Sequence, residues 1–495
     1  MSQKALVRDL LRDPAWQEVD VGFPLPDSPH ACVVSLPTWN SVIGYEEDDP
    51  EVVGKMRSGY PRFFIHPITA HYLKEMEARI AGDQERIMAY SSPEAVQRAA
   101  EYIVRHTGIR GHACSDQPLL LVVPEAGYTA ARDYWRHTGE IISSRQADDL
   151  LQDRCIGSEE REGHRESMAE LLGVETRDAF LFESGMAAIF TLFRVVTERR
   201  PGLKTLQLCF PYVDALKVQE QFGSGVDFIN NPTGDALAKA LTDVRAGAYA
   251  AVFCEVPSNP LLRTVDLPAV AGACKEGGVP LLIDDTICSH ENIDTLAYAD
   301  AASTSLTKWV SGVGDVLAGS VRLRSDSAFA DEFREALEHE VPGGSRLYSR
   351  DGEALLANAA EFRQRVAQCN RNGLQVAEFL EEQVEVKKVY YPAFVDREHY
   401  DAVRRPDGGF GGLISFSLTD PSQTPALYEA MRFCKGPSLG TDYTLVCPYT
   451  LLAHYREIKW AESCGVSAEL PRISVGRESE IELLGRLEEA FEAIR

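Results

Sequence analysis

Between residues 165 and 325, short apolar runs alternate with amphipathic segments of helical length, and this alternation constrains the fold more than any other feature. The apolar runs are residues 179–182, 205–210, 249–254 and 280–283, and between them lie the helical segments 186–199, 213–222 and 268–275. Strands that are covered by helices on both faces read as unbroken apolar runs, because neither face meets water. The sequence therefore predicts an α/β fold in which a large domain holds a mostly parallel sheet.

The regions on either side of this alternation have a different texture. Residues 1–140 mix strand-like pieces, such as 119–123, with proline-rich turns, and we find no catalytic motif there. After residue 345 come a long helical pattern, a strand-like run and a last helix, at 355–382, 412–418 and 478–494. A chain of 495 residues has room for about three domains. We expect an N-terminal extension of unknown role, a large domain and a smaller α+β domain, at 1–140, 141–340 and 341–495.

Composition excludes several classes of function. The net charge of −25 repels phosphate backbones and anionic lipid, so we expect no nucleic-acid or membrane partner. No apolar run approaches the ~18 residues of a membrane span, and the N-terminus carries charges where a signal peptide needs an apolar core. The eleven cysteines form no CxxC pair, which favours buried thiols in a reducing compartment. We expect a cytoplasmic protein without a metal site, because no HExxH motif or Cys/His cluster is present.

Two loops that follow predicted strands carry groups suited to binding a ligand. In a parallel sheet, ligands bind beyond the carboxyl ends of the strands. Gly185 and Met186 open a helix directly after a strand, so that free backbone N–H groups can meet a phosphate. Asn259 lies between two prolines, where its amide can bond a ligand hydroxyl. Taken alone, a serine-capped helix and a plain turn explain these two loops equally well.

Two further loops point to a particular cofactor. Asp284 and Asp285 end an apolar strand, where a carboxylate is costly unless it is paired. An aspartate that keeps a ring nitrogen protonated is what a pyridoxal cofactor requires, although a turn cap is the simpler alternative. Lys308 stands between hydroxyl residues and Trp309, in apolar surroundings that lower the pKa of an amine and let it form an imine. Together the four loops predict pyridoxal 5′-phosphate (PLP) held on Lys308.

The motifs that carry these residues resemble the cystathionine γ-synthase family, the Cys/Met-metabolism group of fold-type I PLP enzymes. The resemblance runs from about residue 140 to the end and rests on segments 184–188, 257–262, 283–286, 305–308, 387–392, 438–440 and 472–476. Three N-terminal segments, 36–39, 59–64 and 137–139, resemble the extended cystathionine γ-synthases of fungi.

The resemblance implies a role for each matching residue. Lys308 would form the Schiff base and later carry protons, and Asp284 would pair with the pyridinium nitrogen. The phosphate would be bound by Gly185, Met186, Ser305 and Thr307, and the ring hydroxyl by Asn259. Arg472 would bind the substrate α-carboxylate with two hydrogen bonds, with Ser438 beside it. Family members also borrow a phosphate-binding arginine from a neighbouring subunit. Arg145 is the match, so we expect a homo-oligomer, a dimer or a tetramer, with shared active sites.

The chain departs from the family pattern at several positions, among them Asp285 in place of a common Asn and Glu183 in place of a common Ser. The family's tyrosine two residues before the borrowed arginine is Ser143 here. The tyrosine that stacks on the cofactor ring matches Phe210, so either Phe210 stacks without a phenol or Tyr212 takes over both stacking and catalysis. Tyr443 replaces a glutamate that many relatives carry near the substrate. These changes leave the expected cofactor-binding residues in place, and they bear on the identity of the second substrate.

The resemblance implies γ-substitution on an O-acylhomoserine, with cysteine as the nucleophile and cystathionine as the product. Two other reactions remain open. In specialised metabolism, a carbon, nitrogen or other sulfur nucleophile would replace cysteine, whereas a γ- or β-lyase would cleave its substrate. A catalytically dead relative is disfavoured, since Lys308, Asp284 and Arg472 are all present.

Overall fold

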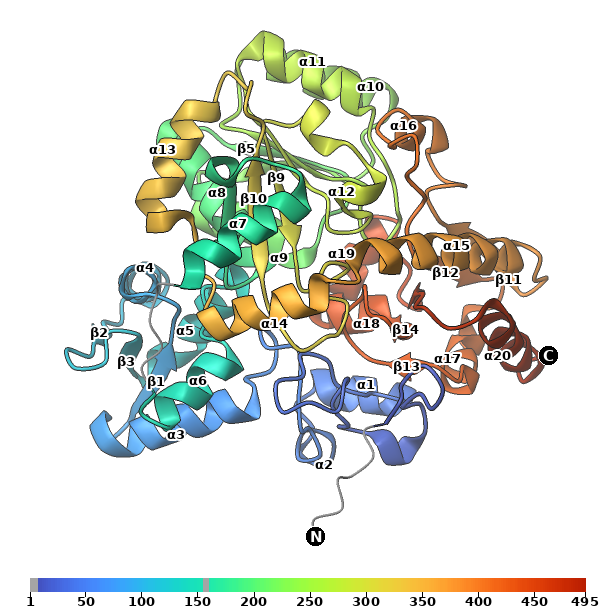
Figure 1. Cartoon of the computed structure of the whole chain (residues 1–495), viewed down its shortest axis with the longest axis horizontal. Coiled ribbons are helices and arrows are strands. Elements are labelled where there is room, and N and C mark those ends of the chain that lie inside the picture. The colour runs from blue at the N-terminus through green and yellow to red at the C-terminus, as the bar shows by residue number, and fades with distance from the viewer. Residues whose placement is uncertain (1–7, 155–159) are drawn as a thin grey trace.

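A seven-stranded sheet forms the centre of the molecule in the computed structural model, which describes residues 8–154 and 160–495 (Figure 1). Its order is β4-β10-β9-β8-β7-β5-β6. The strands are β4 (Ala179–Phe182), β5 (Thr205–Leu208), β6 (Val226–Ile229), β7 (Val252–Glu255), β8 (Leu281–Asp284), β9 (Ala301–Ser305) and β10 (Gly319–Leu323). Strands β5 to β9 pair in parallel, and β10 runs antiparallel to both β4 and β9. The predicted mostly parallel sheet is confirmed.

Helices cover both faces of this sheet, which explains the unbroken apolar runs. One apolar core includes residues of α7 (Glu160–Leu172), α10 (Gly234–Arg245) and α11 (Leu267–Gly277). The other includes residues of α8 (Gly185–Arg199), α9 (Val213–Phe222) and α13 (Ala330–Glu340). The short α12 (Ser289–Asn292) follows β8. Strand β4 and helix α9 have the bounds that the sequence predicts.

Residues 67–151 form a small unit beside the large sheet, whereas the preceding segment, residues 10–56, packs largely against the C-terminal region. The antiparallel sheet of the small unit has the order β1-β3-β2 and consists of β1 (Glu85–Ala89), β2 (His112–Ala113) and β3 (Leu120–Pro124). The helices of the whole N-terminal region are α1 (Trp39–Glu46), α2 (Pro50–Val53), α3 (Pro67–Ile80), α4 (Pro93–Thr107) and α5 (Glu125–Thr138). Helix α6 (Ser144–Leu151) packs on α3.

The C-terminal region is the expected α+β unit. Its sheet has the order β11-β12-β15-β14-β13 and consists of β11 (Val386–Tyr390), β12 (Leu413–Leu418), β13 (Cys434–Lys435), β14 (Leu445–Pro448) and β15 (Pro471–Ser474). The last five helices are α16 (Arg397–Asp401), α17 (Thr424–Ala430), α18 (Tyr449–His454), α19 (Ile458–Ser463) and α20 (Glu480–Glu492). The long helix expected at 355–382 is divided into α14 (Ser349–Ala359) and α15 (Phe362–Glu381). Each sheet lies within one of the three predicted regions, and the exact boundaries stay a prediction.

The described residues contain neither a helix that could span a membrane nor a cluster of metal-ligating side chains. No helix there is long and apolar enough to cross a membrane. No group of three or more His, Cys, Asp or Glu side chains in that part of the chain is arranged to hold a metal ion.

Candidate active site

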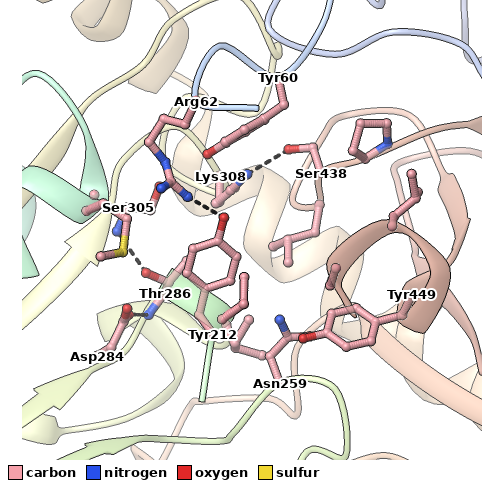
Figure 2. A pocket seen from close by; sticks show the side chains of 18 of the residues that line it. Tyr60, Arg62, Tyr212, Asn259, Asp284, Thr286, Ser305, Lys308, Ser438 and Tyr449 are labelled. Carbon is pink, nitrogen blue, oxygen red and sulfur yellow. Dashed lines mark hydrogen bonds between the residues drawn. The ribbon is translucent and has the colours of Figure 1, made fainter. Parts of the chain in front are cut away.

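One pocket lies where the carboxyl ends of β7, β8 and β9 meet the C-terminal unit and the N-terminal segment (Figure 2). Its walls contain Asp284 from β8, Lys308 from the turn after β9, Arg472 from β15 and Tyr60 from the N-terminal region. All three regions of the chain therefore contribute side chains to a single site. Its position agrees with the general rule that α/β sheets bind ligands beyond their carboxyl edge.

Lys308 points into this pocket. Its Nζ donates to Oγ of Ser438 at 2.8 Å and lies 4.3 Å from the ring centroid of Tyr60. Burial lowers the pKa of the amine, an effect that the Tyr60 hydroxyl partly opposes. Among the described residues, no carboxylate forms an ion pair with Lys308. An amine that is easily deprotonated and not committed to a carboxylate is suited to attack an aldehyde.

The two adjacent aspartates have different environments. Asp285 is fully buried, with its carboxylate bonded to the Thr295 hydroxyl at 2.8 Å and ion-paired to Arg322. Asp284 faces the pocket and accepts one hydrogen bond, from the Thr286 amide at 2.8 Å. Burial raises the pKa of Asp284 to about 6. A half-buried carboxylate without a cation can accept a hydrogen bond from a protonated ring nitrogen, so the prediction of Asp284 for this role fits the structure.

The start of α8 forms the side of the pocket where a phosphate can bind. Ser184 caps the helix by accepting the Ala187 amide at 3.0 Å. A Cβ atom added to Gly185 would lie 2.7 Å from Cβ of Ser305, so only glycine permits this close approach. Gly185, Met186 and Ser305 all line the pocket, as predicted for phosphate ligands. Their N–H and hydroxyl groups are of the kind that bind anions at helix N-termini.

Thr307, also predicted as a phosphate ligand, does not line the pocket. Its hydroxyl accepts from the Ala318 amide at 3.0 Å and donates to the Ala318 carbonyl at 3.3 Å. The side chain is buried and joins the Lys308 turn to the start of β10. Its place in phosphate binding stays a prediction.

Arg472 lines the pocket from β15 of the C-terminal unit. It donates from Nη1 to Oδ1 of Asn259 at 3.0 Å and from Nη2 to the Ser438 carbonyl at 2.8 Å. The guanidinium is 6% exposed and packs 5.0 Å above the Tyr449 ring. No carboxylate of the described residues pairs with it. A buried guanidinium that is bonded only to neutral groups favours an incoming carboxylate.

The side chains of Phe210 and Tyr212 lie in different surroundings. Phe210 is buried in another apolar cluster, where it packs against His454 and Trp460. Tyr212 lines the pocket, and its hydroxyl accepts a hydrogen bond from Arg62. Of the two alternatives for an aromatic group beside the cofactor, the geometry favours Tyr212.

Tyr443 and Arg145 lie away from the pocket. Tyr443 is buried among N-terminal residues such as Leu25 and Val33. Arg145 donates from Nη1 to the carbonyl of Asp315 at 2.6 Å and forms ion pairs with the carboxylates of Asp315 and Asp351. Within this chain neither residue reaches the site, and their predicted roles stay untested.

Tyr60 and Arg62 are pocket residues that the sequence analysis missed, although a signal existed. Tyr60 and Arg62 have the spacing of a tyrosine two residues before an arginine, which Ser143 and Arg145 lack. Both line the pocket, and Tyr60 lies next to Lys308. By sequence, the segment 59–64 shows only a resemblance to the fungal proteins. The fold brings it to the site from the loop before α3.

The residues present fit PLP. Gly185 leaves room for a phosphate, Asp284 offers a carboxylate without a cation, and Lys308 offers an amine of lowered pKa. These are the three groups that a pyridoxal site needs.

Comparison with known proteins agrees with this reading. Residues 152–492 match the family described as Cys/Met metabolism PLP-dependent enzyme. The fold and the site thus define a PLP-dependent enzyme, and the chain belongs to this family.

The similarity to several relatives extends over nearly the whole chain. The cystathionine γ-synthase of Neurospora crassa is 29% identical, over 94% of this chain and 97% of the relative. The L-2-amino-4-chloropent-4-enoate dechlorinase/desaturase of Streptantibioticus cattleyicolor is 31% identical, over 92% and 95%. Among solved structures, the apo form of CalE6, a methionine γ-lyase from Micromonospora echinospora, has a TM-score of 0.57 at 26% identity and covers 68% of this chain and 87% of its own.

Proposed function

We propose that this enzyme carries out γ-substitution on an O-acylhomoserine, with cysteine as the nucleophile and cystathionine as the product. The observation that carries the proposal is Arg472, a buried guanidinium that shares the pocket with Lys308 and has no carboxylate partner among the described residues. The α-carboxylate of an amino acid bound there would complete the hydrogen bonds of Arg472 and bring Cα toward Lys308.

Each protein group then has a definite task. Bound PLP supplies the electron sink for the carbanion that forms at Cα. Nζ of Lys308 moves the proton at Cα, and its lowered pKa keeps the amine available as a base. The carboxylate of Asp284 favours the protonated ring nitrogen. In the net reaction the thiol of cysteine loses its proton, the Cγ–S bond forms, and the acyl group leaves with the oxygen of the broken Cγ–O bond.

Two relatives bear on the choice of reaction. The Neurospora crassa protein is named for cystathionine synthesis, which supports cysteine as the nucleophile. The dechlorinase/desaturase is named for a different reaction on an amino acid, so a family member of similar identity can differ in outcome. Another carbon, nitrogen or sulfur nucleophile therefore remains the alternative, as does a lyase.

One experiment separates these functions. The purified holoenzyme is incubated with O-acetyl-, O-succinyl- and O-phosphohomoserine, each with cysteine, homocysteine, sulfide, simple amines and carbon acids, and products are identified by mass spectrometry. Cystathionine as the main product supports the proposal. A different adduct identifies the other nucleophile, and 2-oxobutyrate without an adduct indicates a lyase. A protein that forms no product and shows no borohydride-sensitive yellow colour would be a catalytically dead relative.

We also propose a cytoplasmic location and a homo-oligomeric state. The ten described cysteines are all free thiols, as is usual in a reducing compartment. Size-exclusion chromatography with light scattering measures the oligomer directly.

A further inference from the structure

We propose that Glu183 is a positioning residue that, together with Ser91 and Arg346, fixes the phosphate-binding start of α8 against the small unit of residues 67–151. This gives the small unit, for which the sequence suggests no role, a part in cofactor binding. The inference rests on the phosphate site at Gly185 and Met186, and not on the choice of nucleophile.

Glu183 stands directly before the turn that is expected to bind the phosphate. It follows the last residue of β4 and precedes Ser184, the N-cap of α8. The residue is 6% exposed, Oε1 accepts a hydrogen bond from the Ser91 hydroxyl, and Oε2 lies 3.3 Å from Nε of Arg346. Burial raises the pKa of Glu183, and Arg346 opposes this shift. The carboxylate is therefore held between the small unit and the loop before α14.

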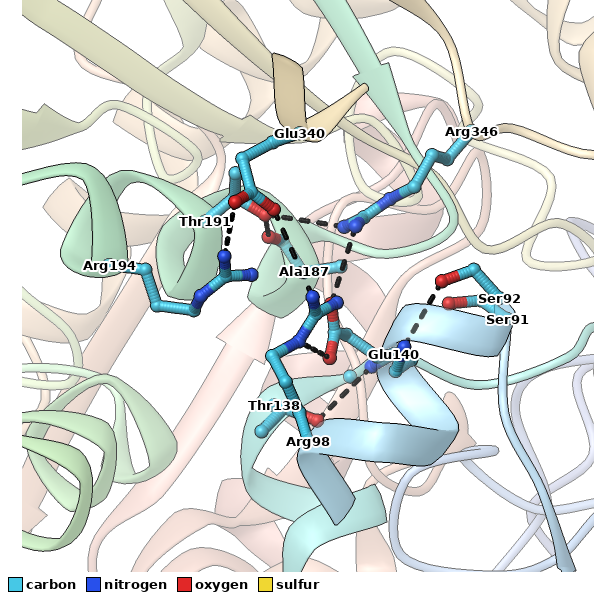
Figure 3. Close-up of polar contacts among 12 residues, drawn as sticks. Ser91, Ser92, Arg98, Thr138, Glu140, Ala187, Thr191, Arg194, Glu340 and Arg346 are labelled. Carbon is cyan, nitrogen blue, oxygen red and sulfur yellow. Dashed lines mark hydrogen bonds and ion pairs between the residues drawn. The ribbon is translucent and has the colours of Figure 1, made fainter. Parts of the chain in front are cut away.

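Arg346 joins Glu183 to a second carboxylate, which belongs to the small unit (Figure 3). Its Nη1 donates to Oε1 of Glu140 at 3.3 Å, and its Nη2 donates to the hydroxyl of Thr191 on α8 at 3.2 Å. The backbone amide of Arg346 donates to the carbonyl of Leu181 in β4 at 3.0 Å. Because one planar guanidinium contacts both glutamates, the place of one carboxylate constrains the place of the other.

Glu140 is a firm anchor for this arginine. It is fully buried, and Oε2 accepts hydrogen bonds from Nε of Arg98 on α4 at 3.2 Å and from the Tyr134 hydroxyl at 2.5 Å. Oε1 accepts from Nη2 of Arg98 (Figure 3). Burial favours the neutral acid, but Arg98 and Arg346 lower the pKa of Glu140 overall. A buried carboxylate that is ionised and bonded through both oxygens is costly to displace.

The backbone of the small unit makes a further contact with the same turn. The Ser184 hydroxyl donates to the carbonyl of Gly139 at 2.9 Å and accepts the Ala187 amide at 3.0 Å. Gly139 has a φ of +69°, and a Cβ atom added there would lie 2.3 Å from that hydroxyl oxygen. The amide of Ser91 donates to the carbonyl of Glu140 at 3.2 Å. The N-cap of α8 and the residue before it are thus bonded to one part of the small unit.

These contacts bear on the phosphate because an anion at a helix N-terminus is bound by the N–H groups of the first turn, which must point at one place. Glu183 acts through these backbone groups. Its loss should therefore weaken the binding of the phosphate more than the binding of the pyridoxal ring.

Titration of the apo enzyme with PLP and with pyridoxal separates the two contributions. The ratio of the Kd for pyridoxal to the Kd for PLP measures what the phosphate adds. Glu183→Gln keeps the size of the side chain and removes its charge. It should raise the Kd for PLP by about tenfold, the weight of one charged hydrogen bond, and leave the Kd for pyridoxal nearly unchanged. An unchanged ratio would overturn the inference.

Asp178 provides a matched control at the other end of the same strand. It directly precedes β4, is 1% exposed, and pairs with Arg334 of α13 at 2.7 Å. Asp178→Asn removes a buried charge there, so it should lower the Tm and leave the ratio of the two Kd values unchanged. If Asp178→Asn reduces the ratio as much as Glu183→Gln does, Glu183 has only a general structural role and the inference is wrong.

Ser91→Ala tests the part of the small unit, because it removes the hydroxyl and keeps the charge of Glu183. It should raise the Kd for PLP by about threefold, the weight of a neutral hydrogen bond. Since Ser91 acts through Glu183, the double variant should bind PLP about as tightly as Glu183→Gln alone. Additive losses, or an unchanged Kd in Ser91→Ala, would show that the small unit does not act through Glu183.

Two further variants keep the test decisive if Glu183→Gln fails to fold. Ser91→Ala and Arg346→Lys are then compared by the same ratio, because lysine keeps the positive charge but cannot contact both glutamates at once. An unchanged ratio in both would overturn the inference. A wild-type enzyme that binds PLP and pyridoxal equally well would refute the phosphate site, and the inference with it. No nucleophile enters these measurements, so failure of the proposed reaction would leave the inference standing.

Discussion

Arg472 and Asn259 are 213 residues apart in sequence, yet Nη1 of the arginine donates to the amide oxygen of the asparagine at 3.0 Å. Arg472 lies on β15 of the C-terminal unit, and Asn259 follows β7 of the central sheet. The contact crosses the pocket wall and joins the group proposed for the substrate carboxylate to the group proposed for the cofactor hydroxyl.

Arg472→Lys should raise the KM for the O-acylhomoserine by about tenfold or more, because a point charge replaces paired donors worth ~1.5–3 kcal/mol per charged hydrogen bond. Steady-state kinetics at saturating nucleophile measure this change. The KM for the nucleophile, taken at saturating donor, should move much less. The reverse pattern would show that Arg472 binds the nucleophile.

Lys308→Ala should abolish turnover and covalent cofactor attachment while the protein stays folded, since one nitrogen atom serves both tasks. Activity, borohydride-fixed PLP and circular dichroism are compared with those of the wild type. Ser438→Ala is the companion variant, because it removes only the hydroxyl that accepts from Nζ at 2.8 Å. We expect Ser438→Ala to keep the attachment. Appreciable turnover by Lys308→Ala would remove the central assignment.

Asp284→Asn should mainly lower kcat, whereas Asp285→Asn should mainly lower the free energy of unfolding. Asp284 pairs with no cation in the described chain, so its amide variant should lose most of kcat and little stability. Asp285 is ion-paired to Arg322 in a fully buried position, so Asp285→Asn should cost about 3–5 kcal/mol of unfolding free energy. Thermal melts and kcat measured on both variants check this, and equal losses of kcat would contradict the assignment.

Attachment of PLP to the apo enzyme should reach its half-maximal rate at a lower pH than attachment to Nα-acetyl-lysine. Only the neutral amine attacks the aldehyde, and burial lowers the pKa of Lys308 from the ordinary 10.5. A lowered pKa keeps the amine neutral over a wider range toward acid, and the reactivity is lost only as the pH falls through this lower value. Stopped-flow absorbance across pH 6–11 follows the reaction. Coincident profiles would show that the site does not tune Lys308.

Local patterns were enough to predict Lys308, Asp284, Gly185 and Asn259, because each stands at or shortly after the carboxyl end of a strand. The carboxyl ends of parallel strands meet at one edge, so the order of strands and helices already brings these residues together. The choice of Asp284 over Asp285 came from the resemblance to the family, and the ion pair that commits Asp285 to Arg322 agrees with it. Local sequence also predicts the mostly parallel sheet.

Tertiary structure alone decided which aromatic and which arginine face the pocket. Phe210 and Tyr212 are two residues apart, and only the packing of Phe210 against Trp460 shows which of them points away. Arg62 enters the site from a loop that no strand pattern marks, and a carboxylate 152 residues later in the chain holds it there. The sequence by itself determined the sheet and the cofactor and predicted the reactive lysine, because periodicity and strand-end motifs are local. The remaining walls of the pocket depend on contacts between distant segments, which form only when the apolar cores pack.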